Sequence, residues 1–121
     1  MFSLNQLKDI LFVDIETVPV VETYDELPER MQALWDKKSA FMRRQDPEKS
    51  SADFFGEKAG IYAEFAKVAC ISCGYLQFDE STTPSISMKS FYGEDERQVL
   101  EDFGKMLDKY TAAKPSRNLC A

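Results

Sequence analysis

Asp14 and Glu16 are the two residues of this chain whose types and spacing could do chemistry together. They follow the apolar run Ile10–Val13, and residues two apart on a β-strand project to the same face. Neighbouring carboxylates repel, and burying one without a partner is costly. A hard divalent cation such as Mg²⁺ or Mn²⁺ removes this cost because it takes oxygen ligands. The other interpretation is a solvated strand end, with both acids exposed or paired with Lys or Arg. The pattern alone leaves both open.

The histidine and cysteine content of the chain excludes several kinds of catalytic or metal-binding site. The chain has no histidine, which excludes Ser/His and Cys/His catalysis. Its three cysteines, an odd number without a secretory signal, are expected to be free thiols. Cys70 and Cys73 lie in an apolar strand-like run, where residues three apart point to opposite faces. We therefore expect them to pack in a core and not to share a metal ion.

The elements that must position these residues alternate between strands and helices. An α/β sheet of mixed direction is the predicted architecture, with a helical insertion at about 22–64 between the first two strands. The third strand alternates with one polar face, and an apolar stripe (Val99, Leu100, Phe103, Met106, Leu107 and Tyr110) marks the last helix. The predicted elements are strands at about 9–17, 68–78 and 85–92, helices at about 31–42, 48–65 and 94–110, a turn at 79–84, and a strand starting at 118.

Two sets of side chains in the insertion could contact nucleic acid. Trp35 and Phe41 could stack on bases, although packing in a core is the favoured interpretation. A basic cluster could bind phosphate groups, and it comprises Lys37, Lys38, Arg43 and Arg44. The alternative interpretation is that these residues form a solvated helix face.

Chain length, net charge and hydropathy limit the number of domains and the kinds of partner that the chain can have. The chain has 121 residues, enough for one domain, and a net charge of −6, which disfavours non-specific binding to nucleic acid. No stretch approaches the roughly 18 apolar residues that a membrane span needs. No secretory signal is recognisable, so we expect a cytoplasmic protein without membrane contact.

The segment Phe12–Pro19 resembles the first motif of the DEDD (DnaQ-like) 3′–5′ exonuclease superfamily, which has the ribonuclease H-like fold. An apolar run, then Asp-x-Glu-Thr, then a proline carries this resemblance. The residues around Lys67–Gly74 resemble the second strand of the branch related to the exonuclease domain of family B DNA polymerases. The helix at 94–110 and residues 117–121 resemble the elements leading to the second motif.

This resemblance implies roles for three residues. Asp14 would bridge two Mg²⁺ or Mn²⁺ ions, Glu16 would bind the ion that activates water, and Thr17 would contact the terminal nucleotide. The implied reaction is two-metal hydrolysis at nucleic-acid 3′ ends, with single-stranded DNA as the expected substrate. The later acidic motifs of the family would follow Ala121. Residues 1–121 are then the N-terminal part of one exonuclease-like domain, cut at the fourth strand and inactive alone. The alternative is a non-catalytic ribonuclease H-like binding or assembly module.

An incomplete sheet has a further consequence. It would leave the strand around Ile10–Val13 near an open edge and an apolar face in water. We therefore expect a homodimer or an aggregation-prone chain.

Overall fold

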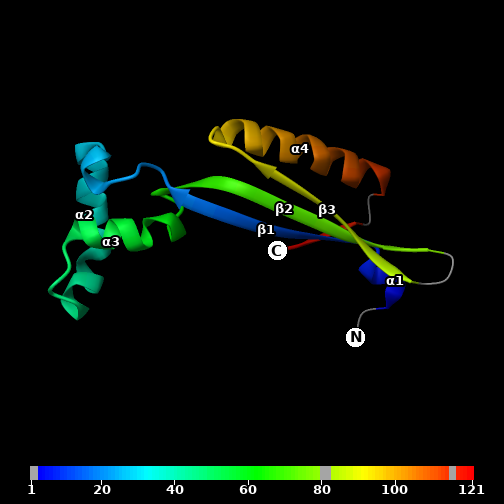
Figure 1. The fold of residues 1–121 in the computed structure, drawn as a ribbon, viewed down its shortest axis with the longest axis horizontal. Helices are drawn as coiled ribbons and strands as arrows, with labels where there is room; N and C mark the ends of the chain where they lie inside the picture. Colours follow the sequence, from blue (N-terminus) through cyan, green and yellow to red (C-terminus); the bar gives the residue numbers. More distant parts are fainter. Residues whose placement is uncertain (1–2, 80–82, 115–116) are drawn as a thin grey trace. The chain divides into compact units, whose positions relative to one another are not determined.

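The computed structural model describes residues 3–79, 83–114 and 117–121 (Figure 1). The chain divides into two compact units, which are considered separately below. A sheet unit consists of Met1–Glu16 with Val68–Ala121, and a helical unit consists of Thr17–Lys67.

Within the described residues the sheet has four strands in the order β3-β2-β1-β4. Their pairings are antiparallel between β2 and β3 and parallel between β1 and β4, so the sheet is mixed, as predicted. The strands are β1 (Ile10–Pro19), β2 (Ala66–Phe78), β3 (Pro84–Tyr92) and β4 (Asn118–Cys120). A short helix that the sequence analysis did not predict, α1 (Leu4–Leu7), precedes β1.

The predicted hairpin of β2 and β3 is confirmed. Its register places Gly74 opposite Met88 and Leu76 opposite Ile86. Part of the predicted turn, residues 80–82, lies outside the described residues.

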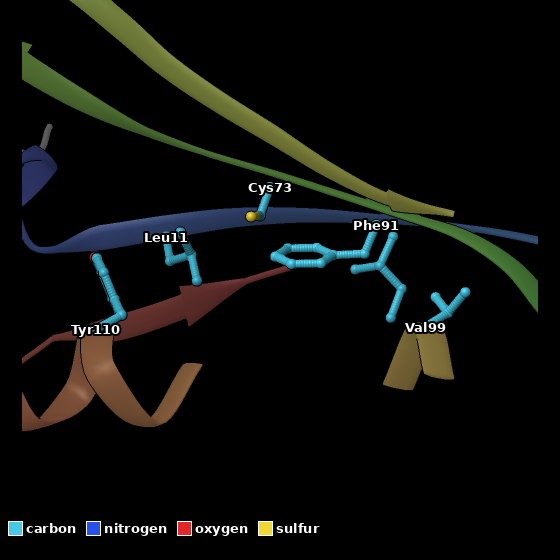
Figure 2. Packing of buried hydrophobic residues seen from close by; sticks show 6 residues of the cluster. Leu11, Cys73, Phe91, Val99 and Tyr110 are labelled. Carbon is cyan, nitrogen blue, oxygen red and sulfur yellow. The ribbon is translucent and has the colours of Figure 1, made fainter. Parts of the chain in front are cut away.

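Helix α4 (Glu96–Ala113) covers one face of the sheet, where the core of this unit lies (Figure 1). Figure 2 shows how Leu11, Cys73 and Phe91 of the strands meet Val99 and Tyr110 of α4. The predicted stripe is correct except at Leu100, which is exposed because it lies at the margin of the stripe. The helix also begins later than predicted, because the Asp95 carboxylate accepts hydrogen bonds from the N–H groups of Arg97 and Gln98 and so caps it.

The alternation along β3 predicted one polar face and left open which side packs on the helix. In the structure the side containing Ser87, Lys89 and Phe91 packs there, and Phe91 is buried in the core against α4. Ile86 and Met88 therefore point to the opposite face and are exposed. A large aromatic ring gains more by burial than the neighbouring polar groups lose, provided that their polar ends still reach water.

The helical unit is built around an aromatic core. Trp35 is fully buried, and its indole N–H donates to the carbonyl oxygen of Ser51 at 2.8 Å. The rings of Phe55 and Phe65 pack edge-on against it. The expected core packing is thus confirmed for Trp35 and wrong for Phe41, which is exposed on the other side of its helix. The elements of this unit are η1 (Tyr24–Glu26), α2 (Glu29–Gln45), α3 (Ser51–Lys58) and η2 (Ala59–Ile61).

The second helix of the insertion is shorter than predicted. Helix α3 ends at Lys58 and passes into the 3₁₀ turn η2, closed by a hydrogen bond from Tyr62 N–H to the Ala59 carbonyl. A Cβ atom at Gly60 would lie 3.3 Å from Cδ of Pro19, so the chain passes close to β1 here. Phe65, which follows this turn, is buried in the core of the helical unit.

Candidate carboxylate site

Asp14 and Glu16 project from the face of β1 that α4 does not cover. Leu11 and Val13 belong to the core under α4, and the strand alternation turns Phe12, Asp14 and Glu16 to the other side. All three of these side chains are exposed. The two carboxylates therefore stand on one accessible face at the end of the apolar part of β1.

Neither carboxylate has a hydrogen-bond or ion-pair partner within the part of the chain that the structure describes. The ion pairs found there join other residues, such as Lys114 with Asp9 and Lys38 with Glu64. Pairing with Lys or Arg, one form of the solvated interpretation, is therefore not observed. Exposure to water also screens the repulsion between the two acids, so the fold does not need a cation to be stable.

The carboxylate oxygens of Asp14 and Glu16 are the right kind of ligand for a hard cation, but two side chains are too few to complete its coordination. Carboxylate oxygens are the ligands that Mg²⁺ prefers, and this ion keeps several waters when proteins bind it. Among residues 3–79, 83–114 and 117–121, no group of three or more His, Cys, Asp or Glu side chains is placed to hold a metal ion. Asp14 and Glu16 thus supply two ligands, and water would have to supply the others.

A hollow of about 680 Å³ opens beside Asp14 on the same face of the sheet. Its walls are mainly apolar and include Phe12, Leu76, Ile86 and Met88, and the absence of a side chain at Gly74 deepens its floor. No sequence pattern used above predicted this hollow. A glycine inside a strand is the signal that could have found it, since such a residue often marks a site where another group approaches closely.

Thr17 belongs to the helical unit. Its hydroxyl donates a hydrogen bond to the carbonyl oxygen of Gly60, which ties the end of β1 to η2. This bond explains the position of the side chain structurally. Contact with a terminal nucleotide stays a prediction.

The four basic residues predicted as one cluster are divided between two faces of α2. Lys38 pairs with Glu64 at 2.8 Å, and this ammonium group lowers the pKa of the Glu64 carboxyl. Arg43 is half-buried and donates to the carbonyl oxygen of Asp36 at 2.7 Å. Lys37 and Arg44 are exposed. The expected cluster is therefore not a single patch of free charge, because residues 100° apart on a helix meet different neighbours.

The cysteines are free thiols, and Cys73 packs in a core as expected, whereas Cys70 belongs to neither core cluster. Cys73 is buried in the core under α4, whereas Cys70 is half-buried on the other face with its sulfur 3.7 Å from Oγ of Ser72. Burial raises the pKa of the Cys73 thiol. The two thiols do not face a common metal site.

Comparison with models of known protein families, with curated proteins and with solved structures finds no match. In the described part of the chain, no helix is both long enough and apolar enough to cross a membrane.

Proposed function

We propose that this chain is the N-terminal part of a metal-dependent 3′–5′ exonuclease domain with a ribonuclease H-like fold. The observation that carries the proposal is the pair Asp14 and Glu16, unpaired and exposed on one face of β1. The sheet supports it. The resemblance implies a fourth strand beyond the first, and β4 lies there, parallel to β1.

In this proposal Asp14 and Glu16 would hold divalent cations close to the 3′ end of a nucleic-acid strand. Bound Mg²⁺ or Mn²⁺ would supply stabilisation of the attacking and leaving oxygens of the phosphodiester. The carboxylates position that charge, and their exposed face leaves room for a strand end to approach. With only two acidic ligands in the described residues, the isolated chain is expected to bind ions weakly and to be inactive.

The second candidate is a non-catalytic binding or assembly module of the same fold. The shortage of acidic ligands around Asp14 among the described residues favours it, as does the open apolar face beside that residue. In this case the two carboxylates are only a solvated strand end.

Paramagnetic broadening by Mn²⁺ separates the two candidates. We expect Mn²⁺ to broaden the amide resonances of residues 13–17 selectively, with a dissociation constant on the order of 1 mM, as for weak oxygen-ligand sites. The substitutions Asp14→Asn and Glu16→Gln should each abolish this broadening. Removing the ion with a chelator should leave the melting temperature unchanged, since both carboxylates are solvated in its absence.

Asp108→Asn is the matched control, because Asp108 is an exposed acid on α4 in the same unit. It should leave the broadening at residues 13–17 intact. Broadening spread evenly over all acidic segments, or unaffected by Asp14→Asn, would contradict the exonuclease proposal and favour the binding module.

A further inference from the structure

Helix α2 has a second organised face that its own core does not use. Its inner face contributes Trp35 and Ser39, both buried, and Met31 and Met42, which pack against the core of the helical unit. Its opposite face carries a row of exposed residues with the spacing i, i+4, i+7, i+11 and i+14, called here the outer stripe. The outer stripe consists of Arg30, Leu34, Lys37, Phe41 and Arg44.

The apolar members of the outer stripe are exposed. Leu34 is 46% exposed and Phe41 is 62% exposed, one heptad apart. Each follows an alanine, Ala33 or Ala40, whose small side chain lets another backbone come close. Spacing of alternately four and three residues is that of the contact positions in a coiled coil. The geometry therefore suits a second helix lying along α2.

The charges on α2 are sorted between its two faces. Off the stripe, Lys38 pairs with Glu64, and Arg43 donates to the Asp36 carbonyl. On the stripe, the three cations have no ion-pair partner among the described residues; they are Arg30, Lys37 and Arg44. No acidic residue belongs to the stripe, although the chain as a whole has a net charge of −6. The stripe is thus a line of unneutralised positive charge interrupted by two apolar side chains.

We propose that the outer stripe docks an acidic amphipathic helix of a partner protein. Aliphatic side chains of that helix pack on Leu34 and Phe41, and its carboxylates face Arg30, Lys37 and Arg44. Successive cations are seven residues apart, or about 10.5 Å at a rise of 1.5 Å per residue. A partner helix with a heptad pattern repeats at the same distance, so it can contact all five residues of the outer stripe at once.

A nucleic-acid strand fits the stripe less well. Its phosphates recur about every 3.4 Å along one strand of a duplex, much more closely than these cations. Binding to single strands also uses several aromatic side chains in succession, and the stripe offers only Phe41. Leu34 has no role in such a complex, whereas it is a contact residue in a helix pair.

A synthetic peptide tests the proposal directly. The probe is a 21-residue helix with Leu at the a positions, which face Leu34 and Phe41, and Glu at the d positions, which face the three cations, labelled for fluorescence anisotropy. A scrambled peptide of the same composition lacks the heptad. We expect the 121-residue chain to bind the heptad peptide and not the scrambled one. Leu34→Ser and Phe41→Ser should each weaken binding about tenfold, the loss typical of a central interface residue.

Matched variants separate the stripe from general surface effects. Leu100→Ser changes a leucine of equal exposure, 46%, on α4, and should leave binding unchanged. Lys37→Gln should weaken binding, whereas Lys109→Gln on α4 should not. Circular dichroism of each variant verifies the fold, and exposed positions are expected to tolerate these changes.

Three results would overturn the proposal. The first is equal binding of the heptad and scrambled peptides, or of neither. The second is an affinity unaffected by Leu34→Ser and Phe41→Ser, which would leave only charge attraction. The third is tighter binding of a 15-nucleotide oligothymidine that depends on Arg30, Lys37 and Arg44, which would assign the stripe to nucleic acid.

Discussion

Burial distinguishes the three thiols of this chain. Cys120 is exposed on β4, Cys70 is half-buried, and Cys73 is buried in the core under α4, where burial raises the pKa of its thiol. The thiolate is the reactive form of cysteine, so both access and ionisation disfavour reaction at Cys73.

We therefore expect iodoacetamide to modify Cys120 first, Cys70 more slowly, and Cys73 only after unfolding. Mass spectrometry of peptides from a time course measures this order. A Cys120→Ser variant should lose the fast phase and keep the others. Early modification of Cys73 in the folded protein would show that the core under α4 opens readily.

Exposure to water removes the energetic cost that the residue types of the carboxylate pair suggested. Their spacing suggested a cost that a cation would relieve, but both Asp14 and Glu16 are solvated. Water screens their repulsion. The case for a metal site therefore depends on resemblance and geometry, and not on any need to stabilise the fold.

At the scale of elements, the start of α3 depends on a reciprocal cap. Ser50 Oγ accepts from Asp53 N–H at 3.2 Å, and the Asp53 carboxylate accepts from Ser50 N–H at 2.8 Å. The Ser50 hydroxyl also donates to the Asp53 carboxylate at 2.7 Å. This hydrogen bond, and then the one from the Ser50 backbone N–H, lowers the pKa of Asp53. A carboxyl with a lowered pKa in the folded state stabilises the protein above its ordinary pKa, and this contribution is lost as pH falls through the lowered value.

Ser50→Ala should therefore lower the free energy of unfolding by about 1 kcal/mol at neutral pH, the usual cost of removing a cap. Asp53→Asn should make stability depend less on pH below about 4, where ordinary carboxyls titrate. Urea unfolding at several pH values measures both effects. Ser85→Ala, a change at an exposed strand position, is the control. An unchanged acid dependence in Asp53→Asn would assign it to other groups, such as Glu64, whose pKa Lys38 also lowers.

On the scale of the whole molecule, one face of the sheet and part of its edge remain open. Ile86, Met88 and Phe12 are exposed on the face opposite α4. Strand β4 pairs with β1 only at Ile10, Leu11 and Phe12, so in the described residues it does not cover that edge as far as Glu16. Open strand edges and apolar patches both promote association.

We predict that the chain associates as its concentration rises. Light-scattering mass across a dilution series should exceed that of a monomer at high concentration, and Met88→Lys should lower it. Met88 is 71% exposed, and Ile61 in the helical unit is 73% exposed, which makes Ile61→Lys the matched control. A monomer at every concentration would show that the open face is tolerated in water.

The amino-acid sequence by itself determined the elements whose signals are local. The apolar run before Asp14, the turn residues between β2 and β3, and the spacing of Val99 and Tyr110 each specify an element through backbone geometry and periodicity. The shared face of Asp14 and Glu16 follows in the same way from the alternation of a strand.

Only the tertiary structure decided which faces are buried. It turned Phe91 toward α4 and left Ile86 in water, it left Leu100 outside the stripe, and it divided the basic residues of α2 between paired and free. Periodicity states which side chains lie on the same face, but burial depends on what packs against that face. That partner comes from residues distant in sequence, so no local pattern reveals it.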